Sequence, residues 1–249
     1  MMHQPNLHTL FNPKGIAVIG ASTHPGKFGF VALHNILASG FDGNIFATNP
    51  KMPEILGIQT LKSVDRIPKD SIDVAMICLG PKQTIAVLPE LAEKGIKAGF
   101  VVSGGFRESG AEGVELEHEL VQVANSLGIT IAGPNGQGFV STPANLCSQI
   151  VSPYPPMGNI SIASQSGNIL SAMLNLSRAK NIGIARAISI GNQAQLGVAD
   201  YIRYFGTDSE TKVVVAYVEG LPNGRDFYDS LKEAVSYTHL RAHETSLHL

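Results

Sequence analysis

Gly15-Ile-Ala-Val-Ile-Gly-Ala-Ser22, continued by Pro25-Gly-Lys-Phe-Gly29, is the stretch that decides the fold. Its apolar run is typical of a buried strand, and the glycines after it suit a tight turn into a helix N-terminus. In an open α/β sheet such turns gather outside the carboxyl ends of the strands, where nucleotide-like ligands bind. The pattern therefore predicts a binder of a large phosphorylated cofactor. Similar apolar runs with small-residue turns occupy residues 45–49, 98–102, 129–133 and 160–163.

Working outward, apolar and helical stretches alternate along the first part of the chain, which predicts a parallel sheet covered on both faces. We expect a complete doubly wound, Rossmann-like α/β domain over residues 1–148. Its expected strands are 15–20, 44–48, 72–79, 98–102 and 129–132, and its expected helices are 27–39, 82–94 and 109–127.

Residues 149–158 contain three prolines and read as a linker, with Cys147 just before it. A second α/β domain is expected over 159–235. Its expected strands are 159–163, 184–190 and 212–218, and its expected helices are 167–180, 197–206 and 225–235. Since doubly wound domains have about five strands, this domain is expected to be incomplete.

The last segment, 236–249, breaks with the preceding pattern because no apolar periodicity continues through it. Its sequence Ser236-Tyr-Thr-His-Leu-Arg-Ala-His-Glu-Thr245 resembles the translation of a transposase adapter used in DNA sequencing libraries. We therefore expect an adapter-derived, non-native tail and a fragment of a longer protein. A disordered natural tail is the alternative.

Composition excludes several classes of function. The chain has 44% apolar residues and 18 basic against 20 acidic side chains, with no run of like charges. This gives no electrostatic footprint for nucleic acid or an anionic membrane, so a small-molecule ligand is expected. The two cysteines, Cys78 and Cys147, form neither a disulfide framework nor a metal-binding spacing. We expect no metal site and a cytoplasmic protein.

The turn after residue 19 has two common look-alikes, and it departs from both. A dinucleotide fingerprint needs Gly-x-Gly-x-x-Gly and a later acidic residue, but Ser22 stands at the second glycine and 48–51 contains no acid. A P-loop needs a glycine where Ala21 stands and a hydroxyl where Phe28 stands. Nicotinamide cofactors and P-loop chemistry are therefore disfavoured.

What remains is a glycine-rich helix start containing Lys27, with Lys51 at the tip of the neighbouring expected strand. Two cations beside one N-terminal nest suit a ligand with separated phosphates, such as coenzyme A with its pyrophosphate and 3′-phosphate. The alternative is that Lys51 is a solvated loop lysine. Ser103-Gly-Gly-Phe106 and Gly133-Pro-Asn-Gly-Gln-Gly138 follow the next strands and add to the same edge, although each alone reads as a tight turn.

Ser164-Gln-Ser-Gly167 follows a strand and opens a helix, an arrangement that suits a phosphate group. It is not a nucleophile elbow, because Ser164 and Asn168 occupy the flanking glycine positions. Helix capping by the serines is the alternative. Glu219 ends the last apolar run at the same edge, where its carboxylate could orient a histidine or be solvated.

Taken together, these motifs resemble the α part of the NDP-forming acyl-CoA ligases, especially ADP-forming acetate–CoA ligases and more distantly the succinyl-CoA synthetase α subunit. The resemblance covers about residues 8–235. It is carried by the ordered set Leu10-Phe-Asn-Pro-Lys-Gly-Ile-Ala-Val-Ile-Gly-Ala-Ser22, Pro25-Gly-Lys-Phe-Gly29, Asn49-Pro-Lys51, Ser103-Gly-Gly-Phe106, Gly133-Pro-Asn135, Ser164-Gln-Ser-Gly167, Gly191-Asn192 and Glu219-Gly220.

The resemblance implies a first domain that binds CoA and a flavodoxin-like second domain that bears a transiently phosphorylated histidine. It implies that acyl-CoA, phosphate and ADP interconvert with acid, CoA and ATP through an acyl phosphate and a phosphohistidine. Glu219 would orient the histidine, and Ser164, Ser166 and Gly167 would hold the phosphoryl group. The implied CoA-binding residues are Gly20, Ser22, Gly26, Lys27, Phe28, Gly29, Asn49, Lys51, Ser103, Gly104, Gly105 and Asn135.

One departure from the family is that no histidine lies between Glu119 and Val235. The chain is therefore expected to bind CoA without turnover, and to need an ATP-grasp domain or β subunit for ADP, ATP and Mg²⁺. Two alternatives stay open. One is a CoA-binding regulatory module fused to an acyltransferase, and the less favoured one is an NAD(P)-binding domain.

Overall fold

Five parallel strands form the first sheet of the computed structural model, which describes residues 5–151 and 154–235. The expected tail at 236–249 lies outside the described residues. The sheet order is β2-β1-β5-β6-β7, the 2-1-3-4-5 pattern of doubly wound sheets, so its switch point falls between β1 and β5. These strands are β1 Gly15–Ile19, β2 Asn44–Thr48, β5 Val74–Ile77, β6 Ala98–Val101 and β7 Thr130–Ala132.

Helices cover both faces of this sheet. Along β1, Ile16 and Val18 belong to one apolar cluster, whereas Ala17 and Ile19 belong to another. A strand buried on both faces reads as a continuous apolar run, which explains why the sequence revealed it. The helix α2 (Phe28–Ala38) packs in the first cluster, and α3 (Pro81–Glu93) and α4 (Ala111–Leu127) pack in the second.

The second sheet has the order β12-β10-β11-β8-β9. Three adjacent strands of this sheet are parallel: β12 (Val213–Tyr217) at the edge, then β10 (Met157–Ser164) and β11 (Ile184–Ser189). The helix α5 (Gly167–Lys180) covers one face, α6 (Val198–Thr207) covers the other, and α7 (Gly224–Val235) packs on α6.

Two strands of this second sheet precede the proline-rich segment. β8 (Gly138–Ser141) runs antiparallel to β11, and β9 (Leu146–Gln149) runs antiparallel to β8. From the sequence, these residues were expected at the end of the first domain, with Cys147 beside a linker. The structure instead gives Cys147 a place inside β9. Four-residue strands carry little periodic signal, and this pairing with β11 is made across the proline-rich segment.

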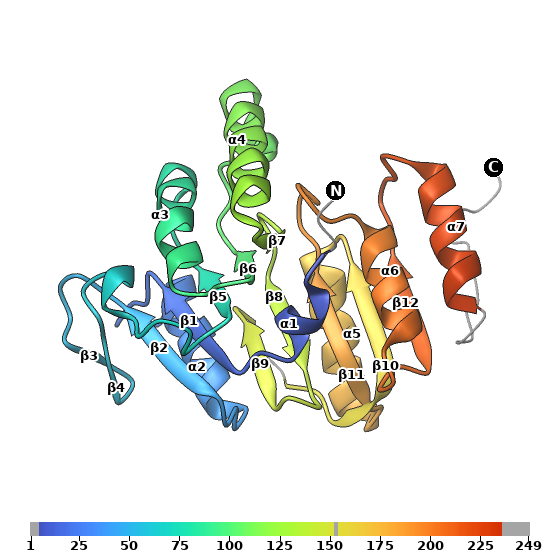
Figure 1. Ribbon diagram of the computed structural model, residues 1–249. Coiled ribbons are helices and arrows are strands. Elements are labelled where there is room, and N and C mark those ends of the chain that lie inside the picture. The colour runs from blue at the N-terminus through green and yellow to red at the C-terminus, as the bar shows by residue number, and fades with distance from the viewer. Residues whose placement is uncertain (1–4, 152–153, 236–249) are drawn as a thin grey trace.

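The two sheets share one apolar core. The helix α1 (Leu7–Phe11), which was not expected, lies between them and contacts β6, β8 and α6 (Figure 1). The Phe11 ring lies 5.8 Å from that of Phe139 and 5.6 Å from that of Phe205, centroid to centroid. Because one cluster of buried residues contains members of both sheets, the two halves pack as one body.

The predicted fold class is confirmed, and the expected strands and helices coincide with observed ones to within a few residues at each end. The remaining elements are short: β3 Glu54–Ile55, β4 Ile58–Gln59, and two 3-10 turns, η1 Val64–Arg66 and η2 Arg107–Ser109. Within the described part of the chain, no helix has the length and apolar character needed to cross a membrane.

Candidate functional site

The turn after β1 is shaped by a contact between two glycines. Gly20 has φ +86°, in the left-handed region that glycine tolerates. A Cβ added to Gly29 would lie 2.2 Å from the carbonyl oxygen of Gly20, so α2 begins directly against the turn. Lys27 is the N-cap of α2 and no side chain caps that end. The helix start therefore offers backbone N–H groups at the switch point.

The loop after β2 is tied to this turn by Asn49. Its Nδ2 donates to the carbonyl oxygen of Ala21 at 2.8 Å, and its Oδ1 accepts the N–H groups of Lys51 and Met52, both at 2.9 Å. The Asn49 amide thus holds the loop that carries Lys51 against the first turn. All three of these hydrogen bonds are internal to the protein, so the Asn49 amide positions Lys51 and the first turn.

The predicted ligand contacts with long side chains at this turn, Lys27, Phe28 and Lys51, are all exposed. Phe28 is 47% exposed although it is a large apolar side chain. In the described part of the chain neither lysine forms an ion pair with an acidic side chain. The ends of β1 and β2 therefore carry two uncompensated positive charges and an exposed ring. Ser22 accepts the N–H of His24 at 3.1 Å, and the N–H of Gly26 is directed at His24 Nδ1 at 3.0 Å.

The loop after β6, residues 103–105, is held by a carboxylate that the sequence analysis did not identify. Glu108 Oε1 accepts the N–H of Gly105 at 2.5 Å and that of Phe106 at 3.2 Å. Burial acts to raise the pKa of Glu108, but hydrogen bonds from Asn192 and from backbone N–H groups outweigh it, so this pKa is lowered. The carboxylate is thus held in its charged form.

A polar cluster joins this loop to the second sheet. Asn192 Nδ2 donates to Glu108 Oε2 at 2.5 Å and to Glu117 Oε2 at 2.9 Å, and Asn192 Oδ1 accepts from Asn135 Nδ2 at 3.3 Å. Glu117 is only 1% exposed and is paired with Arg107. The predicted residue Asn135 therefore reaches the candidate site as part of an interdomain cluster. Gly191-Asn192 marked this place in the sequence, whereas nothing local marked Glu108 or Glu117.

The turn after β10 brings Ser164, Ser166 and Gly167 together. Ser166 caps α5 by accepting the N–H of Ile169 at 3.3 Å, and the buried Ser164 hydroxyl donates to the carbonyl oxygen of Ser166 at 2.7 Å. In this structure the Ser166 hydroxyl therefore acts as a helix cap, which was the alternative to phosphate binding. A Cβ on Gly167 would lie 2.6 Å from Cδ of Gln137, so this side chain lies over the helix start.

Glu219 is placed beside that turn by Gln165. Gln165 Oε1 accepts the N–H groups of Glu219 and Gly220, at 2.6 and 3.0 Å, and Gln165 Nε2 donates to the carbonyl oxygen of Gly220 at 2.8 Å. One amide side chain therefore holds the end of β12 against the end of β10. This role of Gln165 was not expected from the sequence, although Gln165 lies inside the Ser-Gln-Ser-Gly motif.

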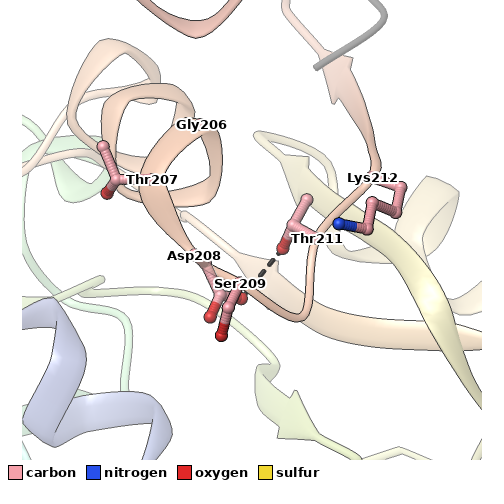
Figure 2. Close-up of a pocket in the computed structure, with 6 residues that line it drawn as sticks. All are labelled: Gly206, Thr207, Asp208, Ser209, Thr211 and Lys212. Atoms are coloured by element: carbon pink, nitrogen blue, oxygen red, sulfur yellow. Dashed lines mark hydrogen bonds between the residues drawn. The ribbon is translucent and has the colours of Figure 1, made fainter. Parts of the chain in front are cut away.

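A cavity of about 370 Å³ lies at the opposite edge of the second sheet, before β12 begins (Figure 2). Its Asp208 already accepts from Thr211 Oγ1 at 2.9 Å and is paired with Arg186. The cavity therefore lies away from the candidate site and offers no free carboxylate there. Its lining residues are Gly206, Thr207, Asp208, Ser209, Thr211 and Lys212.

Comparison with known families gives two matches in succession. Residues 14–142 match a CoA binding domain, and residues 157–240 match a succinyl-CoA ligase like flavodoxin domain. The first match covers the β1 turn and the loops after β2, β6 and β7. The second covers the turn after β10 and Glu219.

Curated proteins are similar to this chain over most of its length. The chain is 40% identical over 213 residues to an acetate–CoA ligase [ADP-forming] of Methanocaldococcus jannaschii, covering 86% of this chain and 30% of that protein. It is 38% identical over 232 residues to the acetate–CoA ligase [ADP-forming] I subunit alpha of Pyrococcus furiosus, covering 92% of this chain and 50% of that subunit. The chain thus spans half or less of the relatives it matches.

Among solved structures, the dinucleotide forming acetyl-coenzyme A synthetase 1 of Ca. Korarchaeum cryptofilum, in complex with phosphate and ADP, superposes with a TM-score of 0.88. It is 35% identical and covers 94% of this chain, which corresponds to 50% of that chain. The likeness extends over both sheets.

Proposed function

Since the chain belongs to the NDP-forming acyl-CoA ligase family, through a CoA binding domain followed by a succinyl-CoA ligase like flavodoxin domain, we propose that it forms the CoA-binding and phosphate-binding part of an ADP-forming acyl-CoA ligase. Coenzyme A would lie across the carboxyl edge of the first sheet. The acid, phosphate and the phosphoryl group would lie at the carboxyl edge of the second.

The observation that carries the CoA site is the environment of Lys27 and Lys51. Both lysines lie without acidic partners, among the described residues, beside a helix start that no side chain caps. A helix N-terminus and two free cations favour a ligand with separated phosphate groups. Phe28 adds an exposed ring beside them, which suits the adenine or the pantetheine chain of CoA. The residues present therefore fit coenzyme A.

For the second sheet we propose the exchange of the thioester for an acyl phosphate, a mixed anhydride of the acid and phosphate. An oxygen of inorganic phosphate attacks the acyl carbon, the C–S bond breaks, and CoA leaves as its thiolate, which then takes up a proton. The N–H groups at the start of α5, beside Ser166 and Gly167, would bind the negative charge of the acyl phosphate. Holding both reactants on one rigid pair of sheets supplies proximity.

The later steps need groups that the described residues do not provide. A histidine would take the phosphoryl group from the acyl phosphate and pass it to ADP, with Glu219 orienting its ring. No histidine occurs between Glu119 and Val235. We propose that an ATP-grasp domain or β subunit binds ADP and Mg²⁺. We also propose a cytoplasmic location, since Cys78 and Cys147 are free thiols.

The experiment is a calorimetric titration of the chain with CoA and, separately, with NAD. We expect CoA to bind and NAD to bind weakly or not at all. Tighter binding of NAD would overturn the proposal in favour of a nicotinamide-binding domain. Incubation of the intact gene product with acetyl phosphate tests the ligase assignment against a regulatory module, because only the ligase would form phosphohistidine.

A further inference from the structure

The 103–105 loop, predicted to contact CoA, is held by an anion from its own chain. Glu108 Oε1 binds the N–H groups of both Gly105 and Phe106. A Cβ on Gly104 would lie 2.8 Å from that same oxygen, so the carboxylate occupies space that only glycine leaves open. Two successive glycines give the free loop many conformations, and the carboxylate selects one of them.

The second sheet holds this carboxylate in place. Each Nδ2 hydrogen of Asn192 has a carboxylate acceptor, one on Glu108 at 2.5 Å and one on Glu117 at 2.9 Å. A backbone hydrogen bond also fixes the position of Asn192, because its N–H donates to the carbonyl oxygen of Pro134 at 2.9 Å. A Cβ on Gly191 would lie 2.1 Å from that oxygen, so this close approach also needs a glycine.

We propose that Glu108 and Asn192 are positioning residues for coenzyme A, which act by fixing the 103–105 loop in its ligand-binding conformation from the second sheet. The inference rests on the proposed function, since it names how that same site is preorganised. Loop ordering before binding raises affinity, because the ligand then does not bear that entropic cost. The N–H groups of Ser103 and Gly104, which have no partner in the described chain, remain for the ligand.

A positioning role of Glu108 and a simple charge effect predict opposite changes in CoA affinity. A carboxylate near a phosphate-bearing ligand repels it, so removal of a charge alone would strengthen binding. Positioning predicts the reverse. Glu112 supplies the matched control, because it lies close by at the start of α4 and pairs with Lys82 at the surface, with both side chains at least 75% exposed.

The test is a calorimetric titration of the purified chain and its variants with CoA, alongside thermal melting. We expect Glu108→Ala and Asn192→Ala each to weaken CoA about tenfold. Glu108→Gln should bind more tightly than Glu108→Ala, because its amide oxygen can still accept both N–H groups. Glu112→Ala should bind like the unaltered protein. The double variant Glu108→Ala/Asn192→Ala should lose little more than either single one, because both act on one loop.

Unchanged or tighter CoA binding by Glu108→Ala, with the unaltered protein binding CoA, would overturn the inference alone. A full additive loss in the double variant would also contradict it. If the unaltered protein failed to bind CoA, the proposed function itself would fail. Should Asn192→Ala not fold, Asn192→Ser, which keeps a smaller polar side chain, is measured instead and carries the same expectation.

Discussion

Arg186 and Asp208 form an ion pair inside the protein, with Nε of the arginine 3.2 Å from Oδ2 of the aspartate and side chains only 2% and 7% exposed. The same guanidinium donates to the carbonyl oxygen of Phe11 at 3.2 Å and to the hydroxyl of Ser141. It therefore connects β11, β8, α1 and the end of α6, at the place where the two sheets share their core.

The first prediction concerns this pair. Asp208→Ala leaves a buried guanidinium without its counter-ion and should lower the free energy of unfolding by about 3–5 kcal/mol. Chemical denaturation measures it. The double variant Arg186→Met/Asp208→Ala also removes the guanidinium charge, so it should be more stable than Asp208→Ala alone. A double variant as unstable as the sum of the two single variants would mean that the pair is not coupled.

The second prediction concerns the contact between Gly20 and Gly29. Gly29→Ala places a Cβ 2.2 Å from a carbonyl oxygen, which α2 can relieve only by moving away from the turn. We expect a loss of about 1–3 kcal/mol in stability and weaker CoA binding, measured by denaturation and calorimetry. Gly224→Ala is the control, since its Cβ would meet nothing within 4 Å. Equal effects of the two substitutions would contradict the role of the close contact.

The third prediction concerns Lys51. If its ammonium group reads the 3′-phosphate, Lys51→Ala should weaken CoA by up to about tenfold and dephospho-CoA less, since solvent screens an exposed lysine. Titration with both ligands gives the comparison. Lys180→Ala, at the far end of α5, should leave both affinities unchanged. Equal losses for CoA and dephospho-CoA would assign Lys51 to another part of the ligand.

The fourth prediction is a pH dependence. Burial raises the pKa of the Cys147 thiol from 9.0 to about 12. As pH rises above about 9, the unfolded chain loses this proton first, so the stability that the neutral thiol contributes falls toward pH 12. Cys147→Ala should remove about 1.4 kcal/mol per pH unit of the alkaline decline. Urea unfolding at several pH values tests this, and an unchanged slope in the variant would contradict it.

The parts of the fold that the sequence revealed are those with strong local signals. β1 and β5 are continuous apolar runs because they are buried on both faces, and α4 ends where Gly128 adopts a left-handed conformation. β8 and β9 escaped notice because each has four residues and because β8 joins the second sheet by pairing with β11 across a proline-rich stretch. The five-residue α1 is likewise too short to show a helical period.

The candidate site divides in the same way. Glycine turns such as the one at Gly20 could be predicted, because glycine is the residue that readily adopts the left-handed backbone conformation of such turns. The side chains that hold those turns, Gln165 and Glu108, were not visible, since each acts on backbone groups whose neighbours are set by tertiary packing. Asn49 was found as a motif residue, but only the structure indicates that its amide is used within the protein.

The hairpin of β8 and β9 has a practical consequence for anyone who wishes to express the halves of this molecule separately. A cut at the prolines would leave β8 and β9 on the N-terminal fragment. In the C-terminal fragment, β11 would then become an exposed edge strand whose unpaired backbone groups favour aggregation. A cut between Gly133 and Gly138 would instead leave each set of five strands intact.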